Sequence, residues 1–123
     1  MSRTHFQHMT VDQLVARYIS IGIDQDKALL RNEIAKFNRL FDEMVVVQNE
    51  LRTRDGDQRR ALLGLYGHPN AQVRLNAAKA TLAVAPEPAR RKLQTMADSR
   101  EYPQAGDAGM TLYALDRGIF KPS

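Results

Sequence analysis

The sequence predicts an all-α fold of six helices, in which an N-terminal capping helix pair is followed by two helical hairpins. Three observations support it. Apolar residues recur at helical spacing along most of the 123 residues, and Gly, Pro and Asn interrupt them at short intervals. The segment LLGLYGHPNAQVRLNAAKATLAVAP, residues 62–86, reads as a helix, a break and an Ala-rich helix. We therefore expect a single all-helical domain over residues 1–123, built as a short, right-handed α-solenoid.

The N-terminal part is expected to contain a flexible start and then the capping helices, over residues 10–54. Residues 1–9 show no periodicity, so we expect them to be flexible. Thr10 and Gln13 have the spacing of a capping box, which predicts that the first helix begins there. Gly22 offers a C-terminal stop for this helix.

The second capping helix is predicted to be much longer, with Asp24 as its N-cap and a span from about Gln25 to Arg52. Residues spaced alternately four and three apart form one stripe on it, which is apolar except for Gln48: Leu30, Ile34, Phe37, Phe41, Met44, Gln48 and Leu51. This stripe is either the face on which the other helices pack or a coiled-coil seam to a second copy. One long helix beside several short ones favours intramolecular packing, and we expect a monomer or homodimer.

The two hairpins are expected over residues 57–118. In the first, Asp57 caps one helix, the chain turns at Gly-His-Pro-Asn (residues 67–70), and Asn70 caps the Ala-rich helix. In the second, Pro103 opens the last helix and Gly118 ends it. The hairpins echo one another at a period near 30 residues, as three pairs show: Leu62 and Leu93, Leu65 and Met96, Ala71 and Pro103.

The chain ends in an apolar tail. Ile119 and Phe120 either fold back over the open end of the last helices, which we favour, or form an exposed interaction patch.

The segment HPNAQVRLNAAKATLAVAP resembles the second helix of HEAT and armadillo-type repeats. Four positions fit the motif: Val73, Arg74, Ala77 and Ala78. The resemblance implies that Arg74 bonds carbonyls or an acid of the neighbouring repeat, with a ligand-facing role as the alternative. The second hairpin departs from the pattern, since Gly106 stands where an Arg is expected.

Over residues 10–123 the chain is similar to a bacterial domain-of-unknown-function family (number two thousand and nineteen). The similarity lies in three segments: LFDEM, a core that runs from QRRALL through HPNAQVR to AAKATLAVAPEPAR, and the ending YPQAGDAGMTLYALDRGIFKPS. It implies a small helical-repeat protein without an established activity. Some small helical-repeat proteins of bacteria serve as immunity or adaptor proteins, and this analogy extends to the present chain only by association.

The net charge of +4 is concentrated in the middle of the chain. Residues 51–100 carry 10 basic and 4 acidic side chains, whereas residues 1–50 carry 6 and 7, and residues 101–123 carry 2 and 3. Solvated helix faces account for such an excess, and so does an anionic partner. Stacked hairpins would align equivalent positions into a basic strip within residues 52–100. The candidate partner-binding residues are Arg59, Arg60, Arg74, Arg90, Arg91 and Lys92.

No pattern of catalytic, cofactor or metal-binding residues competes with the scaffold interpretation. His5 and His8 have a zinc-compatible spacing that chance explains, and His68 suits a surface or capping role in its turn. The chain has no cysteine, no Gly-rich phosphate loop and no converging carboxylate pair. We therefore expect no cofactor, no metal and no enzymatic activity.

The absence of cysteine, of a signal peptide and of a long apolar run predicts a cytoplasmic protein without a membrane partner. We expect a non-enzymatic protein–protein interaction module of adaptor or immunity type, with a partner that the sequence does not identify. The alternative is binding of a nucleic-acid backbone through the basic strip.

Overall fold

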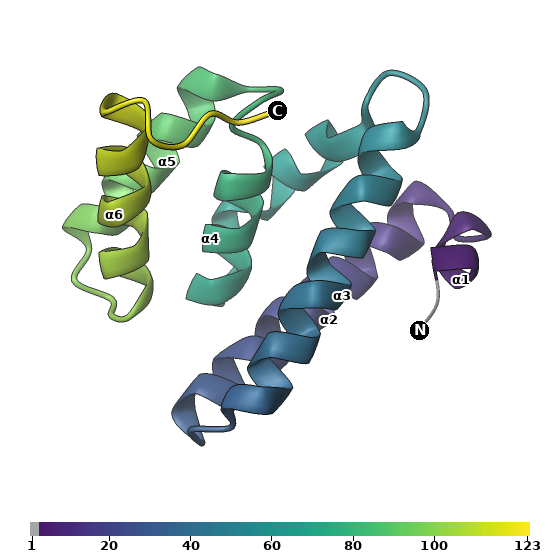
Figure 1. The fold of residues 1–123 in the computed structure, drawn as a ribbon, viewed down its shortest axis with the longest axis horizontal. Helices are drawn as coiled ribbons and strands as arrows, with labels where there is room; N and C mark the ends of the chain where they lie inside the picture. Colours follow the sequence, from purple (N-terminus) through teal and green to yellow (C-terminus); the bar gives the residue numbers. More distant parts are fainter. Residues whose placement is uncertain (1–2) are drawn as a thin grey trace. The chain divides into compact units, whose positions relative to one another are not determined.

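The computed structural model describes residues 3–123, which form helices and turns and contain no strand (Figure 1). The described residues form seven helices: α1 (Arg3–Gln7), α2 (Val11–Leu30), α3 (Ile34–Thr53), the 3-10 helix η1 (Gln58–Gly67), α4 (Ala71–Ala80), α5 (Pro86–Asp98) and α6 (Gln104–Asp116). The all-α class is confirmed, whereas the expected count of six helices is wrong because α1 is added. The chain divides into two compact units, Met1–Ala61 and Leu62–Ser123. Within residues 3–123, no helix combines the length and the apolar character that crossing a membrane requires.

The first unit is built on the hairpin of α2 and α3, which run antiparallel and side by side (Figure 1). Thr10 and Gln13 form the predicted capping box, with the Gln13 amide 3.1 Å from Thr10 Oγ1 and the Thr10 amide 2.8 Å from Gln13 Oε1. The predicted stop at Gly22 and N-cap at Asp24 are wrong, because both residues lie inside α2. The chain turns instead at residues 31–33, where Asn32 has φ of 56°. Asn adopts this left-handed conformation more readily than most residues and can therefore end a helix.

The buried face of α3 differs from the predicted stripe. Four residues spaced four, three and four apart are buried in α3: Leu40, Met44, Val47 and Leu51. By contrast, Leu30 is 82% exposed and Ile34 is 66% exposed. Leu30 ends α2 and so does not continue the row on α3. The alternating spacing of four and three residues was predicted correctly. The buried residues differ from the predicted ones because the break between α2 and α3 lies later in the chain than expected.

Polar side chains join α2 to α3. The Tyr18 hydroxyl is fully buried and accepts a hydrogen bond of 2.6 Å from Gln48 Nε2. Burial raises the pKa of Tyr18, and the hydrogen bond from Gln48 opposes that rise only in part. Arg17 and Glu43 form an ion pair between the same two helices. Because both contacts need one alignment of α2 against α3, they help to fix the register of the hairpin.

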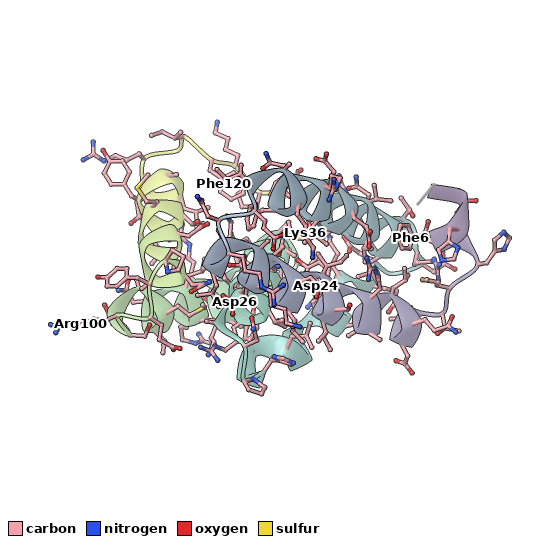
Figure 2. All side chains as sticks on the ribbon, turned by 90° about the horizontal axis from the view of Figure 1, so that it is seen from below. Phe6, Asp24, Asp26, Lys36, Arg100 and Phe120 are labelled. Atoms are coloured by element: carbon pink, nitrogen blue, oxygen red, sulfur yellow. The ribbon has the colours of Figure 1, made fainter. Side chains whose placement is uncertain are left out.

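Helix α1 was not expected from the sequence, whereas the flexibility expected for residues 1–9 stays a prediction, and residues 1 and 2 lie outside the described part. Phe6 is fully buried and lies at α1 beside α3 in Figure 2. The Arg54 guanidinium donates from Nη2 to the carbonyl oxygens of Met9 at 2.8 Å and Phe6 at 3.2 Å. Its Nε donates to Glu50 Oε2 at 2.7 Å, which orients the guanidinium. The buried side chain of Phe6 and the guanidinium of Arg54 therefore hold α1 against α3.

The second unit has a core shared by α4, α5 and α6. Its fully or nearly fully buried members are Leu75, Ala78, Leu82, Ala89, Leu93, Met96 and Ala108. The Ala-rich helix α4 is buried on most of its circumference, as the small side chains of Ala77 and Ala78 predict. Asn70 is its N-cap, and Asn70 Oδ1 accepts from the amides of Gln72 at 2.9 Å and Val73 at 3.1 Å.

Buried polar side chains also connect α4 with α6. Gln104 Nε2 donates to Gln72 Oε1 at 3.0 Å, and Gln72 Nε2 donates to Asn76 Oδ1 at 3.0 Å. Thr81, at the end of α4, shares a 2.6 Å hydrogen bond with the hydroxyl of Tyr66 in η1. Buried amides need partners of this kind, so the chain of three amides favours one pairing of α4 with α6.

Candidate partner-binding surface

The six basic residues predicted to bind a partner are divided between the two units. Arg59 and Arg60 belong to the first unit, and the other four belong to the second. Arg59 is engaged within its own turn, where Nε lies 2.9 Å from Asp57 Oδ1 and Nη2 lies 2.7 Å from Asp57 Oδ2. Hydrogen bonding from Arg59 is the main cause that lowers the pKa of Asp57. Arg60 is exposed, and a basic strip that runs through both units stays a prediction.

Arg74 contacts two backbone carbonyls and one acidic side chain. Its Nη1 donates to the carbonyl oxygens of His68 at 2.8 Å and Pro69 at 3.0 Å. Its Nη2 donates to Glu101 Oε1 at 2.9 Å, in the connection between α5 and α6. Arg74 thereby ties the turn before α4 to the turn before α6. His68 belongs to the same turn, where its Nδ1 accepts from the amide of Asn70 at 3.0 Å.

Ion pairs explain part of the uneven charge along the sequence. The C-terminal residues 101–123 contain three acids, and each of them pairs with a base of α4 or α5. The pairs are Arg74 with Glu101 at 2.9 Å, Lys79 with Asp107 at 3.0 Å, and Arg90 with Asp116 at 3.0 Å. The basic middle of the chain therefore serves partly as the counter-charge of its acidic end. The second unit still carries eight basic and five acidic side chains, a net charge of +3.

Lys92 and Arg91 complete the predicted set. Arg91 is exposed on α5, and Lys92 is half-buried. Partial burial lowers the pKa of Lys92, and the positive charge of Arg74 lowers it further, whereas Glu101 raises it. The charges of Arg74 and Glu101 thus both act on Lys92, whereas Arg90 forms a separate ion pair with Asp116.

An exposed apolar face on α6 was not predicted from the sequence. Met110 is 72% exposed and Tyr102, which precedes the helix, is 71% exposed, while Tyr113 is more than half exposed. The Arg117 guanidinium carbon lies 4.8 Å from the centroid of the Tyr113 ring. Met110, Tyr113 and Arg117 are spaced three and four apart, so they share one face of α6. This spacing was a usable signal, but it is also the spacing of a buried helix face.

The C-terminal tail has features of both structures expected from the sequence, a tail that folds back and an exposed patch. Gly118 has φ of 69° and ends α6, after which the amides of Ile119 and Phe120 donate to Ala114 O at 2.9 and 3.2 Å. The backbone therefore folds back onto the end of the helix. The side chains of Ile119 and Phe120 nevertheless remain exposed, Ile119 more so than Phe120.

The first unit has an apolar surface of its own at the bend between α2 and α3. Leu30 and Ile34 are exposed there, beside a small pocket of about 150 Å³ whose wall includes Leu29 and Phe37. Across residues 3–123, no group of three or more His, Cys, Asp or Glu side chains is arranged to hold a metal ion.

Comparison with known proteins places this fold in a family. Residues 12–116 match the family described as Domain of unknown function (DUF2019). The crystal structure of the protein RPA1889 from Rhodopseudomonas palustris CGA009 is similar, with 55% sequence identity and a TM-score of 0.93 over 95% of this chain and 97% of that chain. No curated protein matches the chain. Because the family match spans most of the sequence, this chain is a member of the DUF2019 family.

Proposed function

We propose that this protein is a non-enzymatic protein-interaction module of adaptor or immunity type. The observation that carries the proposal is the exposed face of α6, where Met110 and Tyr113 lie in solvent and Arg117 stacks on the Tyr113 ring. Met, Tyr and Arg are enriched in the buried centres of protein interfaces, and Tyr and Arg are frequent energetic hot spots. A helix that presents these three side chains to water is suited to covering by another protein.

We also propose that η1–α4 and α5–α6 are degenerate HEAT/armadillo-like hairpins, with α2–α3 as the capping pair. The hydrogen bond between Gln72 and Gln104 supports this, because these residues are 32 apart, the same offset that relates Ala71 to Pro103. Contacts between equivalent positions are the basis of stacking in repeat proteins. In a double-mutant cycle, Gln72→Ala and Gln104→Ala should couple by about 1 kcal/mol in the free energy of unfolding. Additive effects would count against the stacked arrangement.

The interaction function is tested by capture from the native cell. An affinity-tagged chain is expressed there, cross-linked, and its partners are identified by mass spectrometry. We expect Met110→Asp/Tyr113→Asp to lose a partner that the wild type retains, because buried charge at an interface centre is costly. Gln94→Asp, on an exposed site of α5, is the matched control and should retain it. Recovery of the same proteins by all three chains would refute the role of α6.

A second candidate function, binding of a nucleic-acid backbone, is favoured by the net charge of +3 on the second unit. The ion pairs of Arg74, Lys79 and Arg90 weigh against it, because a phosphate would have to compete with an internal carboxylate. Fluorescence anisotropy with duplex DNA at two salt concentrations separates the two functions. Affinity that rises steeply as salt falls supports the nucleic-acid function, and no binding at low salt removes it.

A further inference from the structure

Two cations of the second unit share one carboxylate. Arg74 bonds Glu101 directly, while Lys92 has no hydrogen bond or ion pair of its own in the described part of the chain. The positive charge of Arg74 nevertheless acts on Lys92, and so does the negative charge of Glu101. One carboxylate does not neutralise two cations, so the cluster retains positive charge that attracts a further anion.

Arg74 is pre-organised to hold a carboxylate. Its side chain is only 14% exposed, and two backbone carbonyls fix the orientation of Nη1. Nη2 is thereby directed at the position that the Glu101 carboxylate occupies. A guanidinium held in this way loses little conformational freedom when it binds an acid.

Glu101 is suited to leave this position. Its side chain is 59% exposed, whereas that of Arg74 is 14% exposed, so the Glu101 carboxylate already contacts water and needs little further solvation when it is released. It lies in the short connection between α5 and α6, next to Arg100, which Figure 2 shows reaching away from the protein. Release of Glu101 from Arg74 would therefore cost the fold little, and solvent is directly available to its carboxylate.

We propose that Arg74 and Lys92 form a receptor for a carboxylate of an acidic segment of the protein partner, and that Glu101 occupies this receptor in the unbound chain. This role rests on the proposed protein-binding function and gives the chemistry of the partner. Tyr102 follows Glu101 directly, and its ring lies over Gly106 at the start of α6. The receptor thus adjoins the exposed face of α6, and the partner segment is expected to carry acidic residues beside apolar ones.

The test measures the affinity of the full chain for a fluorescein-labelled hexaglutamate peptide, by anisotropy at a constant 0.15 M salt. Glu101→Gln removes the internal competitor and should bind the peptide about threefold more tightly than the wild type. Asp107→Asn is the matched control, because Asp107 pairs with Lys79 and its substitution changes the net charge equally. It should change the affinity much less, since separated surface charges are screened at this salt concentration. Equal gains in the two variants would overturn the receptor.

A second pair of variants tests the receptor from the cationic side. Lys92→Gln should weaken peptide binding about threefold or more, whereas Arg91→Gln, the exposed neighbour on α5, should have little effect. Arg74 is left intact in these variants because its loss also removes contacts within the turn before α4. Equal losses for Lys92→Gln and Arg91→Gln, or no peptide binding even by Glu101→Gln, would overturn the proposal. Tighter binding of duplex DNA with the same dependence on Glu101 and Lys92 would also overturn it, in favour of a nucleic-acid partner.

These outcomes are independent of the capture experiment on α6. A partner that is lost with Met110→Asp/Tyr113→Asp but binds Lys92→Gln normally would leave the interaction function standing and remove the receptor. Recovery of no partner protein by the wild type would remove the interaction function itself.

Discussion

The buried hydroxyl of Tyr18 makes the stability of the chain sensitive to alkaline pH. In the folded state the pKa of Tyr18 lies above its ordinary value of 10, because burial disfavours the charged form. The unfolded chain therefore loses the proton first as the pH rises. The stabilising contribution of the neutral Tyr18 is fully present below about pH 10 and is lost above it.

The size of the loss follows from the ionisation of the unfolded state. With an unfolded pKa of about 10, the free energy of unfolding should fall by about 1.4 kcal/mol at pH 11 through Tyr18 alone. The measurement is urea unfolding followed by circular dichroism, at pH 8 and pH 11. Tyr18→Phe should lack this component, and the difference between the two proteins cancels the titration of all other groups. Burial also raises the pKa of Tyr66, so the variant retains some alkaline sensitivity.

Tyr102→Phe is the control, since this tyrosine is exposed, and it should leave the wild-type pH dependence in place. An equal loss of stability between pH 8 and pH 11 in the wild type and in Tyr18→Phe would refute the reasoning. It would mean that the Tyr18 hydroxyl ionises without opposition from the fold.

Three further substitutions test how the elements are held. Asn70→Ala should lower the free energy of unfolding by about 1 kcal/mol in urea titrations, because two amides of α4 lose their acceptor; an unchanged midpoint would argue against the cap. Leu93→Ala should cost about 2–5 kcal/mol, since Leu93 is fully buried in the core of the second unit, whereas Gln94→Ala should stay within about 0.5 kcal/mol. Arg54→Met should accelerate amide hydrogen exchange at residues 3–9 through loss of its carbonyl contacts, with exposed Arg52→Met as the unchanged control; equal exchange in both variants would contradict that role.

Predictions that depend on neighbouring residues were the reliable ones. The cap residues Thr10 and Asn70 and the terminator Gly118 act through hydrogen bonds within a few residues, and all three behave as predicted. The burial of α4 was also predictable, because a run of small side chains on a helix suits close approach. These features are encoded locally.

The break between α2 and α3 was predicted at the wrong place. A Gly inside a helix costs about 1 kcal/mol relative to Ala, which is why Gly22 favours a helix stop on local grounds. In the structure Gly22 is a buried residue of α2, and packing of the hairpin outweighs that local cost. Asn32 at the actual turn was the signal that could have corrected the prediction, because it tolerates the left-handed conformation that closes a helix.

The charge pattern shows the same division between local and tertiary information. Composition alone revealed a basic excess in residues 51–100. It did not reveal that Glu101, Asp107 and Asp116 lie against bases 26 to 28 residues earlier in the chain. Only the folded chain distinguishes a base that has an ion pair, such as Arg74, from one for which the described residues show none, such as Lys92.

Sequence alone is enough to predict the all-α class, the N-caps of α2 and α4, the burial of α4 and the family. These features follow from side-chain chemistry over one or two helical turns or from similarity along the chain. The tertiary structure decided which face of α3 is buried, that α1 is held in place, and that Met110 and Tyr113 are exposed. It also brought Gln72 to Gln104 and Glu101 to Arg74. Each of these depends on contacts between residues far apart in sequence, and free energies of packing and charge pairing set them, not local helical preference.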